Sequence, residues 1–243
     1  MKLTRIMSLN PDFQEAVFLK RPNRFLAEVA IQGKVMLVHV PNTGRCRELL
    51  IPGVPVLLEE GRGKGRKTPY SLHYVQNRGV WVNIHSVRAN DAAWMALRQG
   101  RIREIPEPME IRREVIHGNS RIDLYCQSLG QEVYIEVKGV TLLEKETLVF
   151  PDAPTLRGVR HLQELSQLAE EGKRAIVLFV GQHPLGTSFR PNWDGDPLFS
   201  RTLGEAVGRG VEVLCYAASP ETGTYNLTGG ALPYKLTEDS DHE

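Results

Sequence analysis

The sequence predicts an α+β protein in which a small antiparallel β-barrel, residues 1–85, precedes a mixed α/β domain, residues 86–243. Two observations support this division. The first third of the chain holds only short runs of Val, Ile, Leu and Phe, with no long helical pattern between them. From residue 86 onward, helical and strand patterns alternate along the chain, which is typical of a sheet covered by helices.

The barrel prediction depends on six short strand-like runs separated by turn signals. Gln32-Gly33 divides two of these runs as a tight hairpin would, and the segment Pro41-Asn42-Thr43-Gly44 is a firm loop signal. Strands this short and this closely spaced favour a small closed barrel of the OB type. The six expected strands are 16–20, 25–31, 35–40, 54–59, 72–76 and 80–84.

In the second domain the strongest helical pattern runs over residues 155–171. Thr155 can cap its start, and Gly172 follows at the position where a helix commonly stops. Residues 175–180 are continuously apolar, as expected of a central strand covered on both faces. Further helices are predicted over 90–99 and 198–209, and further strands between 111 and 138 and over 211–216.

Composition limits the classes of function. The 243 residues are 41% hydrophobic and 24% charged, and the net charge is only +1, so a nucleic-acid surface would have to come from local clustering of cations. Three cysteines without a Cys-x-x-Cys spacing disfavour a disulfide framework or a cysteine zinc site. We expect a soluble, cytoplasmic protein without a membrane segment.

A charged hairpin carries the chemistry. Residues 120–128 and 131–138 both alternate apolar and polar side chains, with Leu129-Gly130 between them. A two-residue loop there places Asp123 opposite Glu136, so that both carboxylates point to one face of the sheet, and Lys138 shares that face. A loop one residue longer would separate them.

Two opposed carboxylates repel, so something must compensate for their charge. They can share a proton, bind a divalent cation such as Mg²⁺, or pair with Lys138 on a solvated face. Beside a metal, Lys138 could orient an attacking water or stabilise charge on a phosphate. From the pattern alone, a metal site and a solvated, charge-paired face are about equally expected.

Several motifs across the chain identify a family. An Asp followed by Glu-x-Lys on the next strand, with a helix before and after, resembles the PD-(D/E)xK nuclease core. More narrowly, the chain resembles the sugar fermentation stimulation protein A (SfsA) family. The matching segments, in family order, are Arg24–Leu26, Pro41–Gly44, Lys67–Tyr70, Ser120–Asp123, Tyr134–Lys138, Phe150–Thr155, Arg157-Gly158 and His161-Leu162.

The resemblance implies an OB-like domain followed by a restriction-endonuclease-like domain that binds single- or double-stranded DNA non-specifically. Asp123 and Glu136 would hold Mg²⁺ or Mn²⁺, and Lys138 would assist hydrolysis. It also implies a link to the regulation of sugar (maltose) metabolism. Such cores often carry a further Glu on the first helix, where this chain has Met95. Glu114 could replace that ligand, although a surface strand residue is the simpler interpretation.

Clusters of cations indicate where a polyanion could bind. Residues 61–67 form a glycine-rich loop with four cations, and the first turns of the helix from 155 carry Arg157 and His161. Cationic loops are usually solvated hairpin tips, although the expected OB-like setting favours binding, and the helix cluster could also be a plain solvated stripe. Asp152, just before that helix, is either a turn-former, which we favour, or a support for the site. The predicted nucleic-acid contacts are Arg24, Arg45, Arg62, Lys64, Arg66, Lys67, Arg157 and His161.

Three functions follow in order of preference. The first is a DNA-binding protein with a metal-dependent nuclease site. The second is a DNA-binding regulator whose nuclease-like site is silent. The third is a metal-dependent hydrolase of a small phosphorylated molecule.

Overall fold

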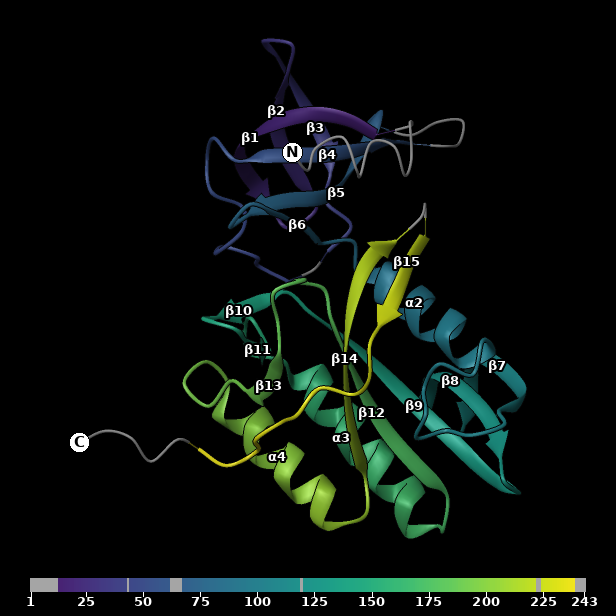
Figure 1. Ribbon diagram of the computed structural model, residues 1–243. Helices are drawn as coiled ribbons and strands as arrows, with labels where there is room; N and C mark the ends of the chain where they lie inside the picture. The colour runs from purple at the N-terminus through teal and green to yellow at the C-terminus, as the bar shows by residue number, and fades with distance from the viewer. Residues whose placement is uncertain (1–12, 43, 62–66, 119, 222–223, 239–243) are drawn as a thin grey trace.

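A computed structural model describes residues 13–42, 44–61, 67–118, 120–221 and 224–238. It shows two domains, with the barrel placed at one end of the α/β domain (Figure 1). The fold expectation is therefore confirmed: an OB-like barrel precedes a mixed α/β domain. None of the helices in the described part of the chain has the length and apolar character needed to cross a membrane.

The barrel closes through two non-sequential pairings. β1 pairs with β4 antiparallel, and β3 meets β5 in a parallel bridge at His39 and Ser71, which completes the ring 1-2-3-5-4 of an OB fold. The hairpin between β2 and β3 turns at Gln32 and Gly33, both at positive φ, as predicted. The strands are β1 (Phe13–Asn23), β2 (Leu26–Ile31), β3 (Lys34–His39), β4 (Pro55–Glu60) and β5 (Tyr70–Asn77), with β6 (Val80–Asn83) paired to β5.

The second domain is built on a six-stranded sheet in the order β15-β14-β12-β9-β8-β7. Its centre is parallel, because β12 lies between β9 and β14 in the same direction, and its outer strands are antiparallel. The strands are β7 (Met109–His117), β8 (Ser120–Ser128), β9 (Gln131–Val140), β12 (Arg174–Gly181), β14 (Glu212–Glu221) and β15 (Thr224–Thr228).

Helices cover both faces of this sheet (Figure 1). α2 (Ser86–Arg98) packs its alanines against one face, where Ile176 and Leu178 of β12 are buried. α3 (Leu156–Glu170) and α4 (Pro197–Gly208) cover the other face, where Val177 and Phe179 are buried. The alternation within β12 therefore supplies both cores, as its continuously apolar sequence predicts.

α3 begins and ends as the sequence predicts. Thr155 is its N-cap and accepts a hydrogen bond from the Gly158 N–H at 3.0 Å, and Gly172 lies just past its end at positive φ. The buried stripe contains Val159, Leu162 and Leu165. The N-terminal end of α3 faces the charged hairpin of residues 120–138, so the Thr155 cap also sets the position of functional side chains.

The fold contains a second, three-stranded sheet that was not predicted from the sequence. β10 (Leu142–Glu144), β11 (Thr147–Phe150) and β13 (Ser188–Pro191) form it in that order, between the barrel and α4 (Figure 1). These strands are only three or four residues long. Such short runs carry too little alternation to be recognised from sequence.

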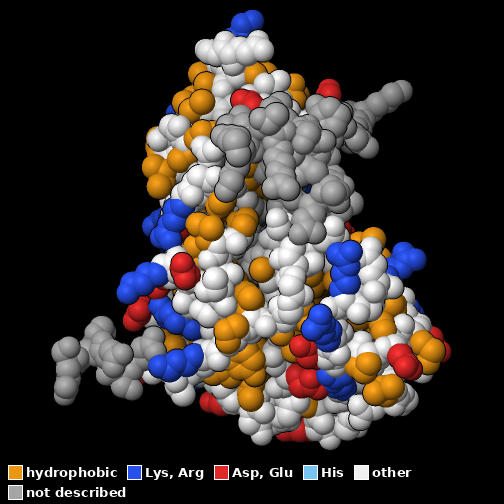
Figure 2. Space-filling view, in the orientation of Figure 1, with side chains coloured by type: hydrophobic (Ala, Val, Ile, Leu, Met, Phe, Trp, Pro, Cys, Tyr) orange, Lys and Arg blue, Asp and Glu red, His pale blue; other side chains and the backbone are white. Residues whose placement is uncertain are grey.

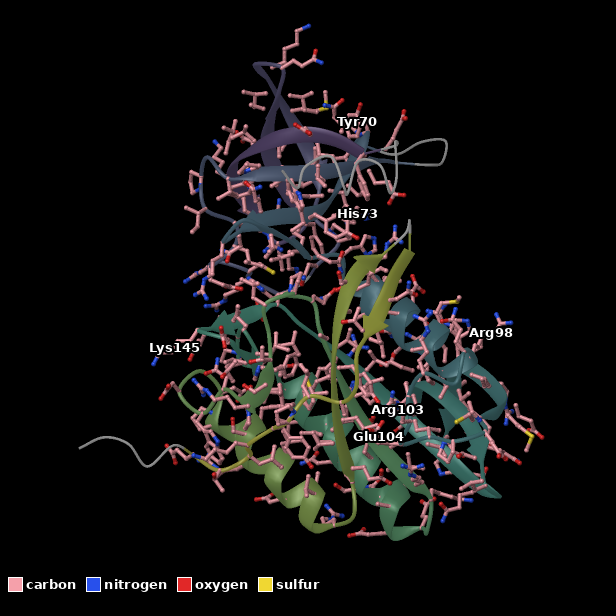
Figure 3. All side chains as sticks on the ribbon, viewed as in Figure 1. Tyr70, His73, Arg98, Arg103, Glu104 and Lys145 are labelled. Carbon is pink, nitrogen blue, oxygen red and sulfur yellow. The ribbon has the colours of Figure 1, made fainter. Side chains whose placement is uncertain are left out.

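Direct contacts hold the barrel against the α/β domain. Asp152 Oδ2 accepts a hydrogen bond from the Cys46 N–H at 3.1 Å, and a Cβ on Gly44 would lie 2.8 Å from the same oxygen. Asn83 donates to Gln182, and Arg78 Nη1 donates to the Lys145 carbonyl at 2.7 Å. Lys145 lies on the β10–β11 turn (Figure 3). The Pro41–Gly44 and Phe150–Thr155 motifs are therefore the two sides of one domain contact.

Candidate metal-dependent active site

The site forms where two paired strands diverge. β8 and β9 pair from Ser128–Gln131 to Leu124–Ile135 around a Leu129-Gly130 turn in which both residues have positive φ, which confirms the two-residue loop. The backbone pairing ends at Leu124–Ile135, one position before Asp123 and Glu136. β9 continues beyond this point in pairing with β12, where Glu136 lies beside Val177.

Beyond the last β8–β9 pair, the side chain of Asp123 makes the hydrogen bond to the β9 backbone. Its Oδ2 accepts from the Val137 N–H at 2.9 Å, and its Oδ1 accepts from Asn90 Nδ2 on α2 at 3.0 Å. Burial and the nearby Glu136 carboxylate raise the pKa of Asp123 above its ordinary value, and those hydrogen bonds offset the rise only in part. Two hydrogen bonds therefore hold the Asp123 side chain in place, while burial and Glu136 disfavour its ionised form.

Glu136 is 2% exposed and has cationic and polar partners. Lys138 Nζ donates to its Oε1 at 2.7 Å, and His161 Nδ1 contacts the same oxygen. Burial acts to raise the pKa of Glu136, but the hydrogen bond from His161 and the charge of Lys138 outweigh it and hold the pKa below its ordinary value. Glu136 is therefore ionised at neutral pH.

His161 links this carboxylate to Arg157. Arg157 Nε donates to His161 Nε2 at 3.3 Å. The other ring nitrogen, Nδ1, contacts Glu136 Oε1 and lies 2.9 Å from Lys138 Nζ, so the ring lies against both the carboxylate and the ammonium group. From the sequence, His161 was predicted only as a DNA contact. The structure buries it at 7% exposure and makes it a partner of the carboxylate.

The geometry corrects the predicted arrangement of the two acids. The sequence placed Asp123 and Glu136 as opposed residues on one face of the sheet. Instead, Asp123 bonds to a helix on one face and Glu136 to a helix on the other. The two carboxylates approach each other where β8 and β9 stop pairing. This is because the Asp123 side chain bonds to the backbone of β9 and does not project from one face of the sheet.

A cavity of about 540 Å³ opens at this gap. Residues from α2, β7, β8, β9 and α3 surround it, so segments far apart in sequence contribute to one space. The lining residues are Ser86, Val87, Asn90, Arg113, Glu114, Asp123, Glu136, Val137, Lys138, Arg157 and His161.

The first helix contributes an amide to this cavity, and the alignment of Met95 with the expected Glu was wrong. Met95 is 37% exposed and does not line the cavity. Asn90, one turn or more earlier on α2, is the residue that reaches Asp123. Helical spacing indicates which residues share a face of α2. Only the packed position of α2 shows which of its turns lies next to Asp123.

Glu114 lies at the exposed edge of the same cavity. Its Oε2 is 4.0 Å from Arg121 Nη1, and its side chain is 67% exposed. Among the described residues, no three His, Cys, Asp or Glu side chains converge as a complete metal cage. Asp123 and Glu136 are thus the two carboxylates available to a cation, and Glu114 stands further out.

Apart from the buried His161, the predicted DNA contacts fall into three groups. Arg157 lines the cavity and is exposed. Arg24, Arg45 and Lys67 are exposed on the barrel, and the Arg24 guanidinium lies 4.6 Å from the centre of the Phe25 ring. The remaining three, Arg62, Lys64 and Arg66, lie outside the described residues.

Surface charge agrees with the low net charge. On the face shown in Figure 2, Lys and Arg side chains lie among Asp and Glu side chains. This mixed pattern gives no broad attraction for a polyanion on that face. The cavity itself is lined by three cations, Lys138, Arg113 and Arg157, and by the three carboxylates of Glu114, Asp123 and Glu136.

Comparisons with known proteins agree with this architecture. Residues 19–84 match the SfsA N-terminal OB domain, and residues 87–223 match the sugar fermentation stimulation protein RE domain. A sugar fermentation stimulation protein homolog of Methanobrevibacter smithii is 44% identical over 236 residues, 93% of this chain and 99% of that protein. Another, from Alkaliphilus oremlandii, is 48% identical over 209 residues, 84% of this chain and 89% of that protein.

A solved structure extends the match to three dimensions. The structure of Pyrococcus furiosus SfsA in complex with Ca²⁺ superposes with a TM-score of 0.84 at 32% identity, over 92% of this chain and 96% of that one. Both domains are included in such coverage. The chain belongs to the sugar fermentation stimulation protein family.

Proposed function

We propose that this protein is a divalent-metal-dependent phosphodiesterase that cleaves nucleic acid without reading its sequence. Residues 86–243 would carry the chemistry, and residues 1–85 would help to hold the phosphate backbone. The observation that carries the proposal is the meeting of Asp123, Glu136 and Lys138 at a gap between diverging strands that opens into a cavity.

The donor set suits a hard divalent cation. Asp123 and Glu136 offer carboxylate oxygens, the ligands that Mg²⁺ and Mn²⁺ prefer, and Mg²⁺ commonly keeps several waters and needs only one or two protein carboxylates. Burial and the neighbouring Glu136 raise the pKa of Asp123, and a cation at the site would favour its ionised form. The solved P. furiosus relative, described as a Ca²⁺ complex, supports a divalent site in the family. A bound cation would polarise a phosphoryl oxygen and its own waters.

Lys138 has a position suited to the reaction. Its side chain is only 12% exposed, and its Nζ lies 2.7 Å from Glu136 Oε1 at the cavity wall. From there an ammonium group can hold the attacking water or stabilise the charge that develops on the phosphate. Removing a preorganised donor of this kind typically lowers kcat by about 10²–10³-fold.

The proposed substrate class follows from the charges around the cavity. Arg157 and Arg113 line it together with Lys138, and cations there neutralise phosphates whatever the base sequence. Exposed Arg24, Arg45 and Lys67 on the barrel would extend the contact. Binding should therefore weaken steeply as salt rises.

A digestion assay tests the proposal. Plasmid DNA and short single strands are incubated with the protein and Mg²⁺ or Mn²⁺, next to the variants Asp123→Ala, Glu136→Ala and Lys138→Ala. Glu205→Ala, which removes an exposed carboxylate on α4, is the matched control. Cleavage by the parent and the control but not by the three variants supports the nuclease. Equal cleavage by all five proteins would identify a contaminant and contradict the assignment.

One observation favours a second function, a DNA-binding regulator of sugar metabolism with a silent site. Lys138 and His161 already contact Glu136, and α2 offers Asn90 where a third carboxylate would strengthen a metal site. Salt-sensitive DNA binding with no cleavage under either metal is the result that would select this function.

A further inference from the structure

A second cavity of about 420 Å³ adjoins the proposed active site. The two cavities share Arg157 and His161, so they are neighbouring parts of one surface. The residues that line the second cavity are Ser120, Arg121, Arg157, Arg160, His161 and Glu164. None of the three catalytic candidates lies in it.

Its charge is strongly unbalanced. Three guanidinium groups face one carboxylate, Glu164, which is 3.5 Å from Arg160. Arg121 lies 4.0 Å from Glu114, at the edge of the first cavity. The Arg121 and Arg160 side chains are both about two-thirds exposed, and exposed pairs at such distances hold their partners weakly. The guanidinium groups can therefore turn toward an anionic ligand.

The residue types match a phosphate. Guanidinium groups bind phosphate oxygens through paired N–H donors, and a serine hydroxyl such as that of Ser120 is a common further donor. Two donors come from the start of β8 and two from the first turns of α3. A ligand in this cavity would thus be held by β8 on one side and by α3 on the other.

We propose that the second cavity binds the nucleic-acid phosphate next to the one being cleaved. The proposal rests on the proposed function and narrows its substrate to polynucleotides, because a small phosphorylated molecule would leave this cavity empty. The phosphate is either internal to a strand or a terminal phosphate. Arg121 and Arg160 are its specific ligands, since Arg157 serves both cavities.

The experiment compares a substrate that reaches both cavities with one that reaches only the first. Bis(p-nitrophenyl) phosphate has a single phosphodiester, whereas a 12-residue oligonucleotide has flanking phosphates. The ratio of their kcat/KM values is measured for the parent and for Arg121→Ala/Arg160→Ala. Arg209→Ala is the matched control, because Arg209 pairs with Glu170 at the opposite end of α3.

The double variant should lower the oligonucleotide-to-diester ratio by about 10-fold or more, because charge-assisted hydrogen bonds to the flanking phosphate are removed. Arg209→Ala should leave the ratio within about 2-fold. A ratio unchanged in the double variant overturns the proposal. Oligonucleotides with and without a 5′-phosphate separate the two sources: a lower ratio on both indicates an internal phosphate, and a lower ratio only on the phosphorylated strand indicates a terminal one.

Failure of the proposed function would be seen separately, as a parent protein that cleaves neither substrate with Mg²⁺ or Mn²⁺. The cavity is then tested by binding alone. A labelled oligonucleotide is titrated at several salt concentrations, and the double variant should reduce the slope of log K against log salt by about one for each phosphate that is no longer neutralised. An unchanged slope overturns the second-cavity proposal in that case.

Discussion

Asp123 Oδ2 accepts the Val137 N–H at 2.9 Å, so a carboxylate on one strand replaces the ladder hydrogen bond that its neighbour would otherwise make. The backbone pairing of β8 with β9 ends at Leu124–Ile135, and this contact holds the Asp123 carboxylate just beyond that point. The same carboxylate has a raised pKa, because it is buried near Glu136. The end of the regular pairing therefore places a buried carboxylate with a raised pKa next to Glu136.

Removing the charge of Asp123 and removing the charge of Glu136 should change the stability of the fold in opposite directions. Asp123 binds its proton more tightly in the folded state, so it favours folding at low pH and this contribution is lost as pH rises from about 3.8 through its raised pKa. Glu136 has a lowered pKa, so its contribution is present above about 4.5 and is lost as pH falls through the folded value.

At pH 7 without metal, Asp123→Asn should therefore raise Tm. Glu136→Gln should lower stability by about 3 kcal/mol, because the largely buried Lys138 would lose the carboxylate with which it forms an ion pair. Thermal and urea unfolding of both variants in EDTA provide the measurement. A fall in Tm for Asp123→Asn would show that its hydrogen bonds outweigh its charge.

Metal should stabilise the folded protein. Mg²⁺ or Mn²⁺ at about 100 times Kd adds roughly 2.7 kcal/mol to the free energy of unfolding, which is a rise in Tm of about 5 °C or more. The rise should vanish in Asp123→Asn and persist in Glu205→Ala. An equal rise in all three proteins would indicate binding elsewhere.

Asn90 offers a way to strengthen the site. Asn90→Asp replaces the amide that donates to Asp123 with a third carboxylate at the cavity wall. Without metal the added like charge should lower Tm, and with metal the affinity should rise, by about 10-fold on the scale of a gained charged ligand. Isothermal titration with Mn²⁺ in the parent and the variant measures the change, and weaker binding in the variant would count against Asp123 as a ligand.

The domain contact should depend on the absence of a side chain at Gly44. Gly44→Ala would place a methyl group 2.8 Å from Asp152 Oδ2, so the barrel must shift or the bond to Cys46 must break, at a cost of about 1–3 kcal/mol. Combining it with Asp152→Ala should cost less than the sum of the two single changes. Strict additivity in urea unfolding would show that the two residues are not coupled.

Local sequence patterns determined much of this protein without help from the structure. The turn at Leu129-Gly130 and the alternation around it set the register of β8 and β9, and Thr155 and Gly172 set the ends of α3. These features depend on residues close in sequence, whose conformational preferences act locally. Asp123, Glu136 and Lys138 could therefore be identified as one cluster.

Only the tertiary structure decided what surrounds that cluster. Asn90 and His161 come from helices on opposite faces of the sheet, where they contact Asp123 and Glu136. Helical spacing could not predict either contact, because it does not determine the position of a helix along its sheet. The same holds for Asp152, whose partner Cys46 lies 106 residues away in the barrel. These contacts result from packing between segments that are distant in sequence, and local conformational preferences do not predict them.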